Sequence, residues 1–253
     1  MTNKLKYFIG NWKMFGDFSS LKIINRIDHF NKRHQKLNKK NKIILCVPST
    51  LIDFFSKRLK RNSIQLGAQN CHHSQKYGPY TGSVSASMLK KAGAKYIILG
   101  HSENRLEGET NQLINKKIKS VINENLKVIF CIGETYKEKK SGKTFSTIRN
   151  QIKKCIKQKF DSNKIIVAYE PVWSIGTGNI PKTHELKKIF IFIKEECKKV
   201  FKKNRMPRIL YGGSVNEKNI KHFSLIDEID GFLIGGASQS SKKFIDIIKN
   251  YYK

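Results

Sequence analysis

Residues 165–178 read Ile165-Ile166-Val167-Ala168-Tyr169-Glu170-Pro171-Val172-Trp173-Ser174-Ile175-Gly176-Thr177-Gly178. The first five are apolar or aromatic, which predicts a strand buried on both faces. Glu170 follows this strand directly, and a loop that starts with proline and finishes with glycine leads to a helical pattern near Thr183. A carboxylate at a strand end beneath such a loop is typical of a catalytic base under a lid. The alternative is a solvated glutamate at an ordinary strand end.

Seven other short apolar segments have the same character, at residues 7–10, 42–47, 63–67, 95–100, 127–132, 208–213 and 231–236. Helical patterns lie between them, for example over 84–91 and 145–159. A strand and a helix about every 30 residues predict an α/β protein with a parallel sheet. Eight such repeats without a linker favour a closed (β/α)8 barrel, with residues 1–253 as a single domain. An open, doubly wound sheet is the alternative, although no G-x-G-x-x-G fingerprint follows the first strand.

The composition is typical of a soluble protein, and hydrophobic residues make up 39% of the 253 residues. The longest apolar runs are too short to span a bilayer, and no stretch of signal-peptide length stands at the N-terminus. We therefore expect a cytoplasmic protein with no membrane partner. Five cysteines without a C-x-x-C pair indicate neither a disulfide framework nor a zinc site. The adjacent Cys71-His72-His73 cannot easily converge on one ion, so no metal is expected.

The net charge is +31, from 50 lysine and arginine residues against 19 acidic ones. Such an excess by itself suggests a polyanionic partner such as nucleic acid. The lysines are spread over nearly every helical segment, however, and no nucleic-acid recognition motif accompanies them. We therefore expect no nucleic-acid partner, although a positive field attracts a small anionic substrate.

Polar residues stand directly after several of the predicted strands. Asn11 and Lys13 follow the first, His101 and Glu103 the fourth, and Glu170 the sixth. In a barrel these strand ends share one rim, so a carboxylate, an imidazole and an ammonium group are expected to converge. This combination favours enolisation: the carboxylate removes a proton next to a carbonyl group while the imidazole and the ammonium stabilise the developing charge. A structural role is the alternative for His101.

Glycines and hydroxyl residues follow the last three strands, as Gly176, Gly212-Gly213-Ser214 and Gly235-Gly236-Ala237-Ser238. Glycine lets backbone N–H groups approach an anion closely, and the loops after strands seven and eight form a phosphate site in many barrels. Tight turns are the alternative for either glycine pair. Two successive pairs at neighbouring strand ends favour a phosphate site.

Seven blocks, in order, are similar to those of the triosephosphate isomerase family and together cover essentially the whole chain. They are Gly10-Asn11-Trp12-Lys13-Met14, Gly67-Ala68-Gln69-Asn70, Leu99-Gly100-His101-Ser102-Glu103, Cys131-Ile132-Gly133-Glu134, Ala168-Tyr169-Glu170-Pro171-Val172-Trp173, Tyr211-Gly212-Gly213-Ser214-Val215 and Gly235-Gly236-Ala237-Ser238. The resemblance implies a TIM barrel that interconverts dihydroxyacetone phosphate and D-glyceraldehyde 3-phosphate through an enediolate, in glycolysis and gluconeogenesis.

The resemblance also implies a role for each site residue. Glu170 is the base, His101 the neutral electrophile assisted by Asn11, Lys13 the contact for the substrate's charge, Glu103 a support for Lys13, and Gly176, Ser214, Gly235 and Gly236 the phosphate contacts. No cofactor or metal is implied.

The family forms homodimers through a projecting loop, which the segment Tyr77–Ser83 resembles; in the family this loop reaches the region of Asn11 and Lys13 in the second copy. The chain departs from the family pattern at three places. Asn104 stands where arginine is usual, in a loop about one residue short; Ser83 replaces a glutamate; and Ser174 replaces an alanine in the lid. The first two put in doubt the salt bridges that brace the rim and the dimer.

Two other functions stay open at this point. One is a phosphate-binding barrel that acts on a larger sugar phosphate. The other is a basic nucleic-acid-binding protein with an inactive barrel, although such a protein would not need Lys13, His101 and Glu170 together.

Overall fold

Strand β6 (Ile165–Tyr169) is buried along its whole length. Because successive side chains of a strand point to opposite faces, its residues divide between two cores. Ile166 and Ala168 lie in the core inside the barrel, and the residues between and beside them lie in the core beneath the helices. Glu170 is the next residue of the inward series, so the strand itself directs its side chain toward the barrel axis.

The computed structural model describes residues 5–59, 63–201 and 206–253. Its strands form a closed parallel barrel in sequence order, in which β1 also pairs with β8. The strands are β1 (Lys6–Asn11), β2 (Asn41–Cys46), β3 (Ile64–Ala68), β4 (Tyr96–Leu99), β5 (Lys127–Ile132), β6, β7 (Arg208–Tyr211) and β8 (Gly231–Ile234). The prediction of a (β/α)8 barrel is confirmed, and the open-sheet alternative is wrong.

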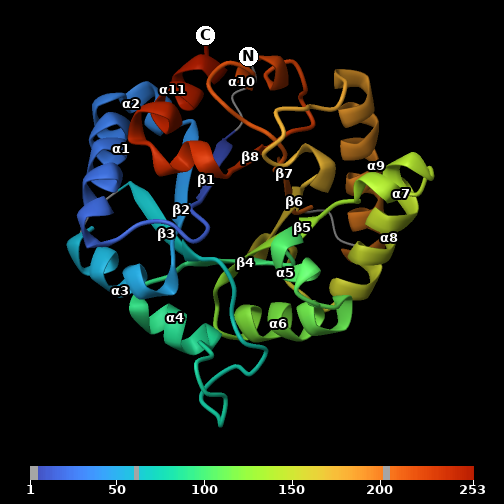
Figure 1. Cartoon of the computed structure of the whole chain (residues 1–253), viewed down its shortest axis with the longest axis horizontal. Coiled ribbons are helices and arrows are strands. Elements are labelled where there is room, and N and C mark those ends of the chain that lie inside the picture. Colours follow the sequence, from blue (N-terminus) through green and yellow to red (C-terminus); the bar gives the residue numbers. More distant parts are fainter. Residues whose placement is uncertain (1–4, 60–62, 202–205) are drawn as a thin grey trace.

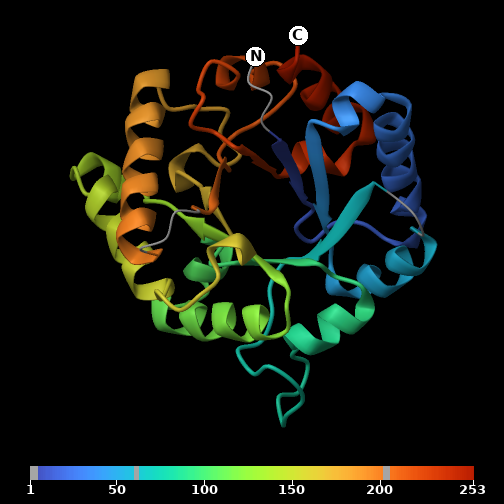
Figure 2. The ribbon, with the colours of Figure 1, turned by 180° about the vertical axis from the view of Figure 1, so that it is seen from behind.

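The helices surround this barrel as an outer ring (Figure 1), which the view from behind also shows (Figure 2). They are α1 (Leu21–Arg33), α2 (Gln35–Asn38), α3 (Ser49–Arg58), α4 (Ala86–Ala92), α5 (Ser102–Leu106), α6 (Asn111–Asn123), α7 (Tyr136–Lys140), α8 (Thr144–Cys155), α9 (Thr183–Phe201), α10 (Ile220–Phe223) and α11 (Ser241–Tyr251). Single 3-10 turns occupy η1 (Phe18–Ser20), η2 (Ser162–Lys164), η3 (Val172–Ser174) and η4 (Gly236–Gln239). Among the described residues, no helix is long and apolar enough to cross a membrane.

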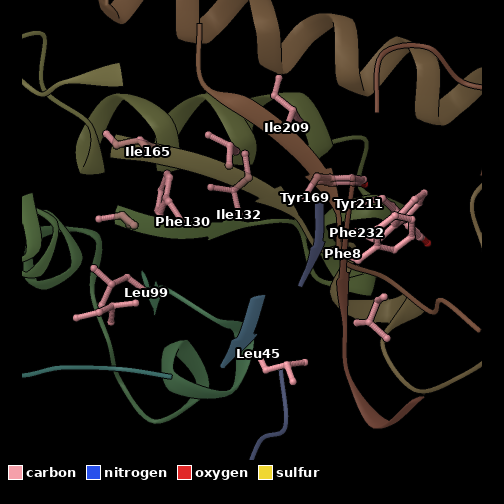
Figure 3. Packing of buried hydrophobic residues seen from close by; sticks show 14 of the residues in the cluster. Phe8, Leu45, Leu99, Phe130, Ile132, Ile165, Tyr169, Ile209, Tyr211 and Phe232 are labelled. Carbon is pink, nitrogen blue, oxygen red and sulfur yellow. The ribbon is translucent and has the colours of Figure 1, made fainter. Parts of the chain in front are cut away.

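The larger core lies between the strands and the helices, where Phe8, Tyr211 and Phe232 gather (Figure 3). The smaller core fills the barrel interior with residues such as Ile98 and Leu210. Strands covered on both faces explain why the sequence shows continuous apolar runs rather than strict alternation. Together the two cores make the barrel a packed scaffold on which the strand ends are held in place.

Helix α8 ends earlier than its pattern predicts, at Cys155 rather than at residue 159. The next residue, Ile156, has an extended backbone (φ −100°, ψ 135°). Ile156 and Phe160 are both buried in the outer core. Removal of apolar surface from water is favourable in any backbone conformation. Burial of these two side chains therefore stabilises the end of the helix at Cys155.

Candidate active site

Glu170 lies at the rim of the barrel interior, with 3% of its surface exposed. Its backbone N–H donates to the carbonyl oxygen of Ile132 at 2.7 Å, which continues the pairing of β6 with β5. Burial raises the pKa of the carboxyl group above its ordinary value, and His101 and Lys13 oppose the rise. A carboxyl group with a raised pKa is a stronger proton acceptor when ionised, which suits a general base.

Two glycines fix the place of Glu170. A Cβ atom on Gly133 would lie 1.8 Å from the carbonyl oxygen of Glu170, and one on Gly212 would lie 2.7 Å from its Cγ. Neither position has room for a side chain without moving Glu170. Gly133 and Gly212, which follow the two neighbouring strands, therefore leave the space that Glu170 occupies.

We expect direct titration of Glu170, by 13C NMR of its carboxyl group, to give a pKa above the ordinary value of about 4.3. The proton-accepting form is then lost as the pH falls through this raised value, earlier than for a surface glutamate. The resonance is assigned by its absence in Glu170→Gln. Glu138 is an internal control, because its partial burial is outweighed by hydrogen bonds from Thr135 and its pKa is lowered. A Glu170 pKa at or below that of Glu138 contradicts the burial argument.

His101 follows β4 after Gly100, whose φ of +70° turns the chain sharply out of the strand. Its Nδ1 accepts a hydrogen bond from the backbone N–H of Glu103 at 3.3 Å, so a neutral ring carries its proton on Nε2. Nε2 lies 3.4 Å from Oε1 of Glu170. The donor face of the imidazole and the carboxylate thus point into the same space.

Lys13 has a left-handed backbone with φ 56°, which is unfavourable for a residue with a side chain. Two side chains hold it there: Oδ1 of Asn11 accepts its N–H at 3.1 Å, and Nε2 of Gln69 donates to its carbonyl oxygen at 2.9 Å. Its ammonium group lies 2.6 Å from Oε1 of Glu103. The strained backbone directs the ammonium toward the site instead of into solvent.

One cavity of about 440 Å³ joins these groups. All eight predicted catalytic and phosphate-contact residues line it: Asn11, Lys13, His101, Glu170, Gly176, Ser214, Gly235 and Gly236. Glu103 lies behind Lys13 and His101 and contacts both. Residues from five separate strand ends therefore meet in one space.

The glycine end of the cavity presents backbone rather than side chains. A Cβ atom on Gly236 would have no neighbour within 4 Å, so its backbone borders open space. The hydroxyl and the N–H of Ser238 both donate to the carbonyl oxygen of Gly235, at 2.7 and 2.8 Å, and fix the turn after β8. Free backbone amides in such a turn attract an anion.

Glu134 connects the lid loop, residues 171–181, to β5 and was not among the predicted site residues. Its buried carboxylate accepts hydrogen bonds from Nε1 of Trp173 at 2.9 Å and from the hydroxyl of Tyr169 at 3.1 Å. Burial raises its pKa, and the Trp173 and Tyr169 donors oppose the rise. The signal that found Glu170, a carboxylate soon after a strand, is also present at Glu134.

Arg105, Glu109 and Lys117 brace the rim next to His101. Arg105 donates to the carbonyl oxygens of Gly100 at 2.8 Å and of Cys131 at 3.3 Å. Glu109 accepts the N–H of Gly100 and forms a buried ion pair with Lys117. The guanidinium group of Arg105 and the Glu109–Lys117 ion pair therefore brace this rim although residue 104 is asparagine.

Lys218 and Lys243 also line the cavity and were missed, because they lie on the segments after β7 and β8 rather than at the strand ends. Both are exposed. They add positive charge to the outer part of a cavity whose inner part already holds Lys13.

Comparison with known proteins gives one consistent result. The sequence model described as triosephosphate isomerase matches residues 6–251. Triosephosphate isomerase of Dictyoglomus turgidum is 40% identical over 253 residues, covering 97% of this chain and 99% of that protein. The enzyme of Bartonella quintana is 36% identical over 256 residues, covering all of both chains. The crystal structure of triosephosphate isomerase from Bartonella henselae superposes with a TM-score of 0.88 at 33% identity, covering 98% of this chain and 99% of that one.

Proposed function

Because the chain belongs to the triosephosphate isomerase family, we propose that it interconverts dihydroxyacetone phosphate and D-glyceraldehyde 3-phosphate with Glu170 as the base. It is an enzyme, an intramolecular aldose–ketose isomerase of glycolysis and gluconeogenesis. The assignment of roles rests on one observation. Oε1 of Glu170 lies 3.4 Å from Nε2 of His101, in the cavity that Lys13 also lines.

The substrate's phosphate binds at the glycine end of the cavity. The N–H groups of Ser214, Gly235 and Gly236 donate to it, and Gly176 of the lid covers it. Backbone donors suit this task because they are fixed by the fold before the anion arrives and need no side-chain ordering. With the phosphate held there, the three carbons of the triose extend toward Glu170.

The carboxylate of Glu170 removes a proton from C1 of dihydroxyacetone phosphate. The C1–H electron pair forms the C1–C2 double bond, and the carbonyl pair moves to the C2 oxygen, which gives the enediolate. After a proton moves between the two oxygens, the carboxylic acid of Glu170 returns a proton to C2 and the carbonyl group forms at C1. Atoms and charge balance without any further reactant.

Negative charge that develops on the oxygens is stabilised by nearby positive and hydrogen-bonding groups. His101 donates through Nε2, and the amide of Asn11 assists it. The ammonium of Lys13 supplies full positive charge, and Glu103 keeps it in place. These groups are oriented before the reaction starts, so they stabilise the transition state without reorganisation.

The proposed reaction is tested by turnover in deuterium oxide. Dihydroxyacetone phosphate is converted by the enzyme, and the product is analysed by mass spectrometry and NMR. Deuterium at C2 of the glyceraldehyde 3-phosphate is expected, because the proton on Glu170 exchanges with solvent. A product without deuterium favours direct hydride transfer, and no conversion contradicts the assigned reaction.

We also propose that the enzyme is a homodimer, formed through the loop around Tyr77–Ser83. This loop, between β3 and α4, extends away from the ring of helices (Figures 1 and 2). Tyr77 and Tyr80 on it are exposed, and so is Met14 on the loop after β1. Exposed apolar side chains on a projecting segment are typical of a protein–protein interface.

We expect the wild-type protein to sediment with twice the mass of the chain, and Met14→Asp to weaken the association by at least about tenfold. A buried aspartate at an apolar interface has no compensating partner. Leu225→Asp is the matched control, because Leu225 is also apolar and exposed but lies just before β8 and not on the loop. A monomeric wild-type protein, or equal effects of both changes, contradicts the proposed interface.

We place the enzyme in the cytoplasm. All five cysteines are free thiols. A chain with five unpaired thiols is suited to a reducing compartment, because an oxidising one favours disulfide formation.

A further inference from the structure

Ser174 lies in the turn η3 of the lid, and its side chain is completely buried. Three polar groups surround its hydroxyl oxygen. The carbonyl oxygen of Asn179, near the other end of the lid, lies at 2.5 Å, the hydroxyl of Tyr211 at 3.2 Å, and the backbone nitrogen of Ser214 at 3.3 Å. One hydroxyl therefore contacts both ends of the lid and the loop after β7.

The number of hydrogens fixes the direction of each bond. A serine hydroxyl has one hydrogen to donate and two lone pairs to accept with. The carbonyl oxygen of Asn179 can only accept, so it receives the hydrogen of Ser174. The hydroxyl of Tyr211 and the N–H of Ser214 must then both donate to Ser174, which leaves its hydrogen-bonding capacity full.

Gly213 provides the space for this arrangement. A Cβ atom there would lie 2.8 Å from the hydroxyl oxygen of Ser174 and 2.3 Å from that of Tyr211. Any side chain at this position would separate the two hydroxyls. The lid and the β7 loop are therefore packed closely at this point, with no space for a side chain between them.

We propose that Ser174 is a positioning residue that controls access of the substrate's phosphate to the Ser214 amide. Its hydroxyl accepts the N–H that the phosphate requires, so the two compete for one donor. Binding of the phosphate breaks the bond from Ser214 to Ser174 and thereby frees the β7 loop from the lid. The inference rests on the proposed function, because it assigns Ser214 to the phosphate.

The first test needs no ligand. Hydrogen exchange of the Ser214 amide is measured by NMR in the free wild-type protein and in Ser174→Ala, and we expect it to be about tenfold faster in the variant because the acceptor is gone. Thr177→Ala is the matched lid control. The Thr177 hydroxyl contacts Trp173, Ser174 and Asn179 but not the β7 loop, so exchange at Ser214 is expected to be unchanged. Equal exchange rates in wild type and Ser174→Ala overturn the proposal.

The second test measures the competition, with inorganic phosphate as the probe. We expect Ser174→Ala to bind phosphate roughly two- to tenfold more tightly, the range of one hydrogen bond. The KM for the triose phosphate falls by the same factor while kcat is unchanged, because the competing bond is absent from both the substrate complex and the transition state. A merely structural role for Ser174 predicts weaker binding, so unchanged or weaker binding overturns the proposal. If amide exchange and phosphate binding both shift as expected in a protein without isomerase activity, the Ser174 inference stands and the proposed reaction fails.

Discussion

Replacing Glu170 by glutamine lowers kcat by roughly 10³- to 10⁴-fold, the upper part of the range for a general base. The amide keeps the shape of the carboxyl group but cannot accept a proton from carbon. Turnover is measured with a coupled assay in both directions. Glu217→Gln is the matched control, since Glu217 lines the outer part of the same cavity and has no assigned role. We expect its kcat to stay within about threefold of wild type. An active Glu170→Gln variant contradicts the assignment of the base.

The Glu170→Gln variant should fold as well as the wild type, and more stably at neutral pH. A carboxyl group whose pKa is raised in the folded state contributes stability below its unfolded pKa, and this contribution is lost as the pH rises through the folded pKa. At neutral pH the ionised, buried carboxylate therefore costs stability that a neutral amide does not. A thermal midpoint at or above that of wild type separates lost chemistry from lost structure.

Replacing Lys13 by methionine lowers kcat by about 10²- to 10³-fold and raises KM, because the ammonium contacts both the bound substrate and the charge that develops on it. Methionine has nearly the length of lysine without its charge. Lys218→Met removes a charge from the outer part of the same cavity and is the control. We expect Lys218→Met to change kcat by less than about fivefold, since an exposed charge acts through screened, long-range attraction. Similar losses in both variants indicate that the general positive field, and not local contact, supports the reaction.

The barrel and the inner part of the site could be predicted because they follow from local patterns. Continuous apolar runs mark strands covered on both faces, and the first polar residues after a strand lie at the rim of a parallel barrel. This reasoning found Lys13, His101 and Glu170, which the structure brings together in one cavity. The assignment of residues 1–253 to a single domain, and the roles of the site residues, stay predictions.

The missed features depend on partners that are distant in sequence. The bond between Ser174 and Tyr211 joins residues 37 positions apart, and that between Trp173 and Glu134 joins residues 39 apart. A short run of residues shows that a side chain is polar but does not show which distant group it meets. The same limit applies to Arg105, whose sequence position gives no sign that its guanidinium group donates to the carbonyl oxygens of Gly100 and Cys131.

The pairing of β1 with β8 has a consequence for how the enzyme is made. Residues Tyr7 to Gly10 hydrogen-bond along residues Gly231 to Ile234, so the sheet closes only through the two ends of the chain. Lys13 follows β1 and Gly235 follows β8, so the ammonium group and the phosphate-binding amides are far apart in the sequence. The two halves of the site therefore come together only when β8 pairs with β1, and a chain whose barrel has not closed cannot hold the substrate's phosphate beside Lys13.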